Sequence, residues 1–463
     1  MNTVIHWFRR DLRVSDNTAL HEAAKRARTV IPVFILEDAW RTGPDAGAAR
    51  LAFLLQAVES LRKDLAELGH RLVVRAGQAE EILPALCREC GAQAVFASQG
   101  YEPQARQRDE RILMSLLNQG VGFELHKDAV IWAEQEILTQ LGTPYTVFTP
   151  YAKAWKARPV PPAKPRLGPA QGAAPDLRSD RLPATVAKGT QPLPPAGELA
   201  ALEQLRRFMA GPVRNYGRDR DFPAVAGTSG LSPHLHAGTI GIRTVLAALK
   251  QAREQAAAAQ QASCDVFLNE LIWREFYTQV LCNFPHVVKS AFRPEYDRLP
   301  WSENRAHFQA WCEGRTGYPI VDAAMRCLNA TGTMHNRQRM IVAMFLTKDL
   351  LINWQWGERY FMQQLVDGDL AANNGGWQWS AGTGTDAAPY FRIFNPVSQA
   401  EKFDPAGGFV RRWIPELQGC PDELIQRPWE NPLLLSQSKY PRRIVLHEIQ
   451  RDKCLAMFKA VKK

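Results

Sequence analysis

The residues whose types could do chemistry are concentrated in one stretch, residues 367–395 (DGDLAANNGGWQWSAGTGTDAAPYFRIFN). Two acids, Asp367 and Asp369, precede an Asn-Asn-Gly-Gly sequence, and Trp377 and Trp379 follow it. We interpret the Asn-Gly segment as a turn, which would let the backbone approach a ligand closely because glycine has no Cβ. The tryptophans offer flat surfaces to an aromatic ligand or a nucleobase. A buried aromatic loop that only packs the core would have the same composition, so the stretch alone does not decide.

A second candidate is the small-residue sequence GTSGLS at residues 227–232, which enters a helical pattern. Its hydroxyls and free backbone N–H groups would suit a phosphate or pyrophosphate. An ordinary N-cap, in which Ser or Thr caps its own helix, uses the same residues. Taken by itself, the motif favours the N-cap.

Length and composition limit the class of protein. At 463 residues, with 46% hydrophobic and 22% charged residues, the chain is typical of a globular protein with two domains. It contains no run of 18 apolar residues, and its N-terminus lacks the cleavage pattern of a signal peptide. We therefore expect a protein of the cytoplasm that does not span a membrane. The net charge of +10 and the pI of 9.2 permit a polyanionic partner without proving one.

Eight cysteines are scattered along the chain, and only Cys87 and Cys90 lie close together. They fall in a helical pattern with no second pair or His cluster beside them. We interpret them as structural thiols in a reducing compartment, and we predict no metal site.

The first part of the chain alternates between apolar, β-branched runs and helical patterns. The expected strands are 3–7, 29–35, 71–75 and 94–98, and the expected helices are 16–27, 47–68, 78–90 and 103–118. This alternation predicts a doubly wound, Rossmann-like α/β domain with a parallel sheet covered on both faces, at residues 1–130. No G-x-G-x-x-G follows the first strand, so a dinucleotide-binding function of this domain is disfavoured.

The second part of the chain is predicted to be all-helical. Residues 131–198 are expected to be a linker, because ten prolines between 159 and 195 make this segment semi-extended and poorly able to pack. The domain at 199–463 follows, with no convincing strand. Its expected helices are 199–209, 237–260, 265–282, 318–330, 334–352 and 356–366.

Six motifs in a fixed order carry a resemblance. They are WFRRDLR near the N-terminus, GTSGLSPHL, NELIWREFY (269–277), GYPIVDAAMR (317–326), MHNRQRM (334–340) and DGDLAANNGGWQWSAGTGTDAAPYFRIFNP (367–396). Together they resemble the photolyase/cryptochrome flavoproteins, most closely the bacterial cyclobutane pyrimidine dimer photolyases. The resemblance implies an α/β antenna domain and a helical domain that holds one noncovalent FAD. It also implies light-dependent repair of DNA, in which an electron passes from excited, reduced FAD to a flipped-out dimer and splits the cyclobutane ring.

The resemblance also implies a flavin site. Arg339 is expected to pair with Asp367 beside the ring, and Asn373 stands where the family places the side chain that faces flavin N5. An amide there is a neutral hydrogen-bonding group that supplies no ready proton. Arg274 matches a contact on the phosphate side. The implied cofactor-binding residues are Tyr216, Thr228, Ser229, Gly230, Leu231, Ser232, Phe267, Arg274, Arg339, Asp367, Gly368, Asp369 and Asn373.

A lesion pocket and a DNA-binding surface are implied in the same way. Glu270 would hydrogen-bond the dimer, and Trp273 and Trp379 would enclose it; the implied catalytic set is Glu270, Trp273, Asn336, Met340, Asn373 and Trp379. The implied DNA contacts are Arg220, Glu270, Arg274, Tyr277, Asn336, Arg337 and Gln399, of which Arg220 and Arg337 are expected to face phosphates. Trp377, Trp354 and Trp301 match a chain of tryptophans that runs from flavin to surface and photoreduces oxidised FAD.

The antenna chromophore is the least determined part of the resemblance. Folate-binding members carry an Asn-Glu pair after the fourth strand and a His after the second, whereas this chain has Tyr101-Glu102 and no His in 38–47. The run from Glu102 to Asp109 is closer to the deazaflavin-type members. A deazaflavin is therefore favoured over methenyltetrahydrofolate, and a flavin antenna or an empty site stays open.

Two other classes of function were weighed against repair. Signalling cryptochromes of plants tend to carry Asp, and those of animals Cys, where this chain has Asn373. A redox flavoenzyme acting on a small molecule would need a nicotinamide fingerprint that the first domain lacks. Members that repair (6-4) photoproducts carry two histidines where this chain has Asn336 and Met340, and single-strand-preferring cryptochromes tend to replace the residue at Trp379. We therefore expect a protein that acts on cyclobutane pyrimidine dimers. We also expect it to be a monomer and to act on nucleoid DNA.

Overall fold

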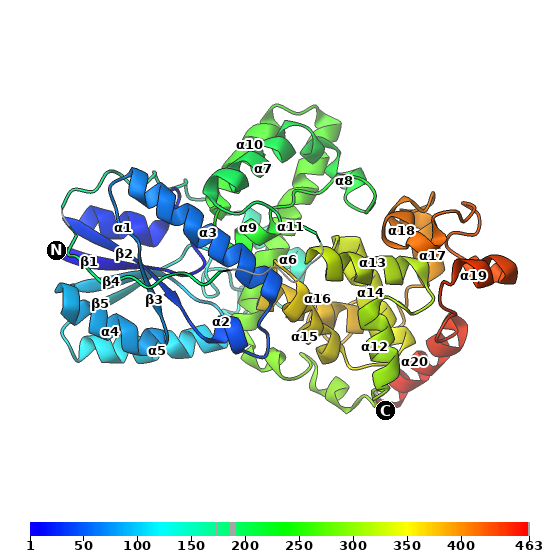
Figure 1. Ribbon diagram of the computed structural model, residues 1–463. Helices are drawn as coiled ribbons and strands as arrows, with labels where there is room; N and C mark the ends of the chain where they lie inside the picture. Colours follow the sequence, from blue (N-terminus) through cyan, green and yellow to red (C-terminus); the bar gives the residue numbers. More distant parts are fainter. Residues whose placement is uncertain (173, 185–190, 462–463) are drawn as a thin grey trace.

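The computed structural model describes residues 1–172, 174–184 and 191–461. Figure 1 shows a sheet-containing region at the N-terminal end and a larger helical region that carries the C-terminus. The two regions are the α/β and all-helical parts that the sequence predicts.

The α/β region is built on a five-stranded parallel sheet in the order β3-β2-β1-β4-β5. The strands are β1 Thr3–Phe8, β2 Thr29–Leu36, β3 Val73–Ala76, β4 Ala94–Ser98 and β5 Gly122–His126. Four of them were predicted from continuous apolar runs. The fifth, β5, was missed because it is an edge strand whose residues are mostly only half-buried, so it lacks such a run.

Helices cover both faces of the sheet. Helices α1 (Thr18–Arg26) and α3 (Ala48–Glu67) pack on one face, and α4 (Ala79–Cys90) and α5 (Pro103–Leu117) pack on the other. The short helix α2 (Ala39–Thr42) follows β2. Because each face of the sheet is buried against helices, both sides of β1 are apolar, and His6 is the buried polar exception.

The proline-rich segment is better packed than its composition suggests. It is preceded by α6 (Phe148–Lys156), and Leu167 and Leu177 are 8% and 3% exposed within the two cores of the α/β region. The backbone N–H of Leu167 donates to Val14 O at 2.9 Å. The expectation of poor packing was therefore wrong for these residues, because two leucines anchor an otherwise extended chain. Residues 173 and 185–190 of the expected linker lie outside the described residues.

Among the described residues after 197, the secondary structure is helical. The α-helices are α7 Glu198–Ala210, α8 Tyr216–Asp219, α9 Ser232–Ala237, α10 Ile242–Glu254, α11 Ala258–Asn283, α12 Arg305–Glu313, α13 Pro319–Thr331, α14 Asn336–Met344, α15 Trp354–Gln364, α16 Leu370–Ala381, α17 Pro396–Phe403, α18 Gly408–Trp413, α19 Pro432–Ser438 and α20 His447–Val461. Shorter turns are η1 Pro212–Asn215, η2 Pro285–Val288, η3 Pro294–Arg298, the π-helical η4 Phe345–Asp349, η5 Pro415–Leu417 and η6 Pro428–Glu430.

Two predicted helices are divided in the structure. The segment 237–260 was expected to be one helix, but Gly238 adopts φ +70° after α9 and the chain breaks again between α10 and α11. The segment 334–352 becomes α14 and the π-helical η4, after which Leu351 has φ +54°. Periodicity alone did not detect these breaks, because the flanking residues keep an apolar pattern.

The Asn-Asn-Gly-Gly sequence is not a turn, contrary to our interpretation. It lies inside α16, whose N-cap Asp369 accepts a hydrogen bond from Ala372 N at 3.1 Å. Gly375 is required by packing, since a Cβ at this position would lie 2.1 Å from the Tyr277 ring. Gly357 of α15 makes similar room for the Trp377 ring, again with 2.1 Å to a would-be Cβ. These glycines therefore allow close approach between helices.

A buried ion network joins the two regions. Asp128, which follows β5, contacts Arg13 at 2.6 Å and Arg243 of α10 at 2.7 Å. Arg243 also pairs with Asp16 at 2.6 Å, and all four side chains are at most 4% exposed. Charges taken out of water need partners of this quality, so the network fixes how the α/β region sits on α10.

Neither a membrane-spanning helix nor a metal-binding cluster occurs among the described residues. No helix among them is long and apolar enough to cross a membrane. Within the same part of the chain, no group of three or more His, Cys, Asp or Glu side chains is arranged to hold a metal ion.

Candidate flavin and DNA site

The acids of the 367–395 stretch lie at the start of α16, and one of them has the partner that was expected. Arg339 Nη2 of α14 contacts Asp367 Oδ2 at 2.8 Å and Oδ1 at 3.0 Å, which confirms the predicted pair. Burial by itself would raise the pKa of the Asp367 carboxyl, but the Arg339 charge and a hydrogen bond from Ser232 bring that pKa below its ordinary value. The pair is therefore ionised, and it links α14 to the start of α9 and α16.

The small-residue turn leads directly into α9. Gly230 adopts φ +64°, Ser229 O accepts from Gln204 Nε2 at 2.6 Å, and Leu231 is 1% exposed. Thr228 and Ser232 remain exposed. The buried Leu231 thus anchors the turn and leaves Thr228 exposed, where its hydroxyl can meet an anionic ligand, while the Ser232 hydroxyl donates to Asp367.

Aromatic residues back the turn. Tyr216 of α8 and Phe267 of α11 meet edge to face with 5.2 Å between ring centroids, and Phe208 lies 4.8 Å from Phe267. Phe267 is 4% exposed, so it supports the site from behind. Arg274 donates to the carbonyl oxygens of Ala129 at 2.6 Å and Leu235 at 3.4 Å. Its guanidinium is therefore engaged by backbone at the junction of the two regions, and its contact on the phosphate side of the cofactor stays a prediction.

Asn373 is held in place by α15. Its Nδ2 donates to the Glu358 backbone oxygen at 2.9 Å, and the neighbouring Asn374 Nδ2 donates to Glu358 Oε1 at 2.9 Å. Burial raises the pKa of Glu358 to about 7, against the lowering effect of the Asn374 hydrogen bond. Glu358 therefore orients both amides, and the Asn373 side-chain oxygen accepts no hydrogen bond from the described residues.

Several buried polar atoms in this part of the fold lack a partner among the described residues. They are His335 Nε2 and both amide atoms of Gln338 at α14, and Trp377 Nε1 on α16. Buried polar groups are seldom left unpaired in native proteins. These atoms lie at α14, which carries Arg339, and on α16, which follows Asp367. A large polar ligand such as FAD would give them partners.

A second wall of the site comes from one face of α11. Glu270, Trp273, Arg274 and Tyr277 follow the i, i+3, i+4, i+7 spacing of a helix face. The Trp273 ring stacks on Phe148 of α6, with 3.8 Å between centroids and 4° between planes, and it meets Tyr277 at 5.3 Å. Glu270 is the acid of this aromatic wall.

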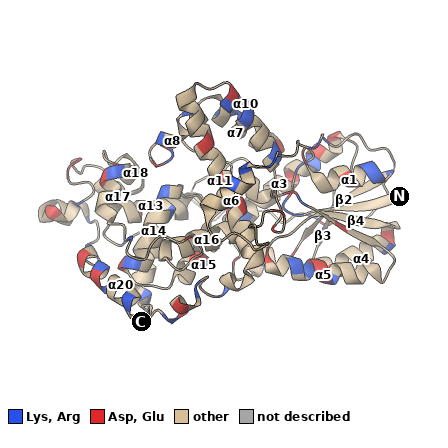
Figure 2. Ribbon diagram, turned by 180° about the vertical axis from the view of Figure 1, so that it is seen from behind, with Lys and Arg blue, Asp and Glu red and all other residues tan. Residues whose placement is uncertain are grey.

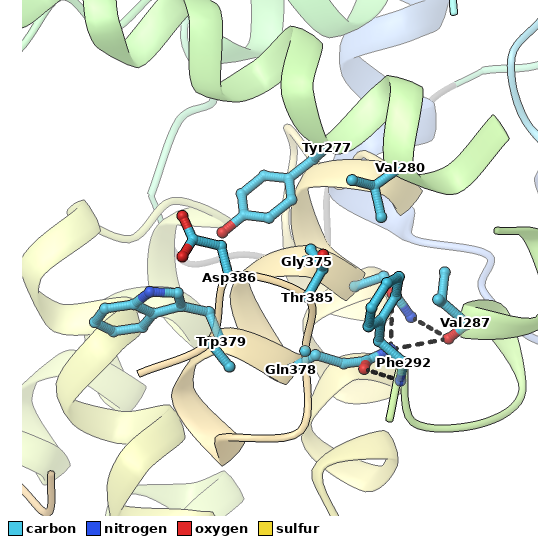
Figure 3. Close-up of a pocket in the computed structure, with 12 residues that line it drawn as sticks. Tyr277, Val280, Val287, Phe292, Gly375, Gln378, Trp379, Thr385 and Asp386 are labelled. Atoms are coloured by element: carbon cyan, nitrogen blue, oxygen red, sulfur yellow. Dashed lines mark hydrogen bonds between the residues drawn. The ribbon is translucent and has the colours of Figure 1, made fainter. Parts of the chain in front are cut away.

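A pocket lies between Tyr277 and the segment that follows α16. Trp379 and Asp386 line it as well, and Figure 3 shows the Tyr277 hydroxyl directed toward the Asp386 carboxylate. Asp386 also accepts from Phe148 N at 2.9 Å, so it ties this segment to the residue that stacks on Trp273. The structure thus connects the two predicted tryptophans, Trp273 and Trp379, through Tyr277.

The remaining lesion residues lie on α14 and α17. Asn336 is exposed at the start of α14, one turn before Met340, and Asn336 Nδ2 approaches Met340 Sδ at 4.0 Å. Gln399 lies partly buried in α17. These positions are compatible with the rim of a pocket.

Both arginines expected to face DNA phosphates already have acidic partners. Arg220 pairs with Glu270 at 2.6 Å, and Arg337 pairs with Asp221 at 2.7 Å while lying 4.2 Å over the Phe403 ring. Basic residues are visible at α8 and α18 in Figure 2. Binding of DNA would therefore exchange a carboxylate for a phosphate at each arginine.

Arg337→Ala tests this surface. Each phosphate contact releases counterions, so we expect the slope of log affinity against log salt for dimer-containing DNA to fall by about one unit. The control is Arg26→Ala, which removes a surface arginine of α1 that pairs with Glu22 and Glu124. An unchanged slope in Arg337→Ala would contradict a phosphate contact.

The three predicted electron-transfer tryptophans share one core. Trp377 and Trp354 are 2% and 3% exposed within it, and Trp301 packs against it. Ser302 N donates to Leu351 O at 2.7 Å, which places Trp301 beside the segment that leads into α15. Trp354 and Gly357 lie three residues apart on α15, and Gly357 faces the Trp377 ring.

Comparison with known proteins decides the family. Family models described as DNA photolyase and as the FAD binding domain of DNA photolyase match residues 4–169 and 267–460. Proteins named deoxyribodipyrimidine photo-lyase from Escherichia coli (strain K12) and Salmonella typhimurium are each 43% identical to this chain and are matched over 100% of both chains. This chain belongs to the DNA photolyase family.

Solved structures of photolyases have the same fold. A bacterial class III photolyase from Agrobacterium tumefaciens superposes with a TM-score of 0.93 at 38% identity, over 100% of this chain and 98% of that one. An archaeal photolyase from Sulfolobus tokodaii, solved with two FAD molecules, superposes with a TM-score of 0.83 at 32% identity, over 99% and 100%. As in the photolyases, the helical region is an FAD-binding domain.

Several residues near the site were missed by sequence reasoning. Phe148 and Asp386 shape the aromatic wall, Glu358 orients Asn373, and Glu275 accepts hydrogen bonds from Ile131 N, Trp132 N and Trp155 Nε1 at 2.6 to 3.0 Å. Burial raises the pKa of Glu275 to about 7. Phe148 and Glu358 lie outside the six motifs, and Glu275 and Asp386 lie inside two of them without a role that the sequence indicates, so only the tertiary contacts reveal all four.

Proposed function

We propose that this protein is a light-dependent DNA repair lyase that splits cyclobutane pyrimidine dimers. The observation that carries the proposal is the pairing of two walls: the Asp367–Arg339 pair and Asn373 on one side, and Glu270 with the aromatic face of α11 on the other. When bound, reduced FAD excited by light supplies the electron that splits the dimer and takes it back. In this proposal, side chains of the protein bind and orient the cofactor and the lesion.

The flavin is held, in this proposal, by the residues around α9, α14 and α16. Thr228 and Ser232 bind phosphate and ribityl oxygens, and Tyr216 with Phe267 closes the back of the site. Arg339 places positive charge beside a reduced, anionic ring, and Asn373 offers a hydrogen-bond acceptor without a transferable proton.

The lesion binds against α11. Trp273, Tyr277 and Trp379 receive the apolar faces of the two pyrimidines, and Glu270 hydrogen-bonds their polar edge. Extrusion of a base from the duplex costs a few kcal/mol and costs least for a damaged base, as is general for enzymes that work on flipped bases, photolyases included. Arg220 and Arg337 offset that cost through phosphate contacts once they leave Glu270 and Asp221.

A second chromophore is part of the proposal, and a deazaflavin is favoured over a folate. Glu102 stands where the folate-binding members use a carboxylate, but it is paired with Arg10 at 2.6 Å. Two further residues of the segment from Glu102 to Asp109 are also in ion pairs: Asp109 pairs with Arg9 at 2.7 Å, and Arg108 pairs with Glu37 at 2.8 Å. We further propose that the protein acts as a monomer on nucleoid DNA in the cytoplasm.

The proposal is tested by repair of defined oligonucleotides under blue light, with protein purified and loaded with reduced FAD. We expect the cyclobutane dimer to be repaired and the (6-4) photoproduct to be left intact, because Asn336 and Met340 supply no imidazole at the pocket. An absorption spectrum of the same sample identifies FAD and any antenna. Failure to bind FAD, or failure to repair the dimer, overturns the proposal; in the second case a photoreceptor function is favoured.

Trp273→Ala tests the aromatic wall. Loss of a stacking tryptophan costs roughly 1–3 kcal/mol per base, so we expect affinity for dimer-containing DNA to fall by about fivefold to 140-fold. Affinity for undamaged DNA should change little, because phosphate contacts dominate it. Phe148→Ala is the companion variant: it leaves Trp273 in place but removes the ring that Trp273 stacks on, and should give a smaller loss. Equal losses on damaged and undamaged DNA would contradict a lesion-binding role.

A further inference from the structure

Two arginines of the α/β region reach the acids of the flavin site. Arg10 follows β1, and its Nη1 lies 2.6 Å from Glu102 Oε1 and 3.8 Å from Asp369 Oδ2. Arg50 of α3 donates from Nη1 to Met362 O at 2.6 Å. A Cβ on Gly368 would lie 2.2 Å from that same nitrogen, so Arg50 lies directly against the segment between the two acids.

The backbone fixes the position of Arg10. Gly238 ends α9 with φ +70°, and a Cβ at this position would lie 1.9 Å from the Arg10 carbonyl oxygen. Leu12 N donates to Ala237 O at 3.4 Å in the same contact. The loop after β1 therefore rests directly on the end of α9, and the buried ion network around Asp128 holds the two regions together nearby. Arg10 thus lies at the interface, and its side chain, which is 37% exposed, is held there by Glu102.

Arg10 is the charged partner of Asp369 in this arrangement. His236 Nδ1 lies 3.6 Å from Asp369 Oδ2, and burial and the neighbouring Arg10 lower the pKa of His236. Burial alone would raise the pKa of the Asp369 carboxyl, yet His236 and Arg10 bring it well below its ordinary value. Asp369 is therefore ionised, and Arg10 is one of the positive groups that compensate its charge.

We propose that Arg10 is a positioning residue of the α/β region that sets the charge balance of the flavin site and thereby favours the reduced, anionic form of the cofactor. The inference rests on the flavin site described under the proposed function. A negative Asp369 without its cation would repel a reduced flavin and the pyrophosphate of FAD. Arg50 adds a second positive charge from the same region, beside Gly368. The α/β region thus acts on the redox chemistry of the helical domain.

The direct test is a redox titration of the FAD-loaded, full-length Arg10→Gln variant. We expect the midpoint potential of the bound flavin to move to a more negative value. A tenfold loss in relative stabilisation of the reduced form corresponds to about 59 mV for a one-electron couple. The dissociation constant for FAD should rise in the same variant. Arg10→Lys should restore both values, since it keeps the charge.

Two matched variants make the result specific. Arg26→Gln removes an arginine of the α/β region that pairs with two glutamates far from Asp369 in sequence, and should leave the potential unchanged. Glu102→Gln removes the acid that shares Arg10, and should move the potential in the positive direction.

The inference is overturned if Arg10→Gln has the potential of Arg26→Gln, or if Glu102→Gln shifts the potential negatively or leaves it unchanged. The Glu102→Gln measurement decides the question alone if Arg10→Gln does not fold. A wild-type protein that takes up no FAD would instead overturn the proposed function, so the two failures are distinguishable.

Discussion

Trp377→Phe is expected to reduce the photoreduction of oxidised FAD to the background rate. Trp377 is buried in α16, and its ring occupies the space that Gly357 of α15 leaves open, on the helix that begins with Trp354. Trp301 lies against the same core, beside the segment that leads into α15. Removal of the first member of this series leaves the outer two without a short path to the cofactor. Phenylalanine preserves the apolar packing but is far harder to oxidise than tryptophan.

The variant separates photoreduction from repair. Enzyme that is chemically reduced before illumination should keep most of its repair activity, because Trp377 does not line the pocket with Tyr277 and Trp379. The measurement is the flavin absorbance under blue light with an external reductant, followed by repair with pre-reduced protein. Trp413→Phe is the control, since Trp413 packs against the same core but lies outside the series. Photoreduction at the normal rate in Trp377→Phe would remove Trp377 from the pathway.

The fold could be predicted from the sequence wherever local pattern and tertiary environment agree. The apolar strands β1, β2 and β4 are buried on both faces, so composition alone reveals them. β5 has no such run because its environment is an exposed sheet edge. The divisions at Gly238 and at η4 depend on how neighbouring segments pack, which periodicity does not contain.

The same limit applies to the site: the motifs predict some of its residues, but contacts between distant segments are seen only in the structure. The ordered motifs led to Arg339 and Asp367, and the structure brings these two side chains within 2.8 Å. The Asn-Gly sequence misled us, because glycine serves both turns and close helix packing, and only the position of Tyr277 distinguishes them. The roles proposed for Arg10, Phe148 and Glu358 depend on contacts between segments far apart in the chain.

The N-terminal motif helps to identify the family, but it does not give the role of each of its residues. WFRRDLR contributed to the recognition of the family, but the separate tasks of its arginines are visible only in three dimensions. Arg9 pairs with Asp109 inside the α/β region, Arg10 reaches Asp369, and Arg13 joins the buried ion network. One short loop therefore connects the sheet, the flavin acids and the interface between the two regions.

Asp128→Ala is expected to cause the largest loss of stability among the variants considered. It would leave Arg13 and Arg243, which are 2% and 4% exposed, without the carboxylate that contacts both of them. Breaking a buried ion pair by removing one partner typically costs about 3–5 kcal/mol, because the charge left behind has lost both water and partner. At about 1.4 kcal/mol per decade this is a hundredfold to several-thousandfold change in the folded-to-unfolded ratio.

The measurement is urea denaturation of Asp128→Ala beside Asp176→Ala, which removes the exposed partner of Arg71 and should cost at most about 1 kcal/mol. The effect should also depend on pH in a definite direction. Burial alone would raise the pKa of Asp128, but the Arg13 and Arg243 charges bring it below its ordinary value. A lowered carboxyl pKa contributes stability that is present above the unfolded pKa and is lost as the pH falls through the folded one. The difference between wild type and Asp128→Ala should therefore be constant near neutral pH and shrink only in acid below about pH 4. A variant as stable as Asp176→Ala would show that the buried network does not hold the α/β region to α10.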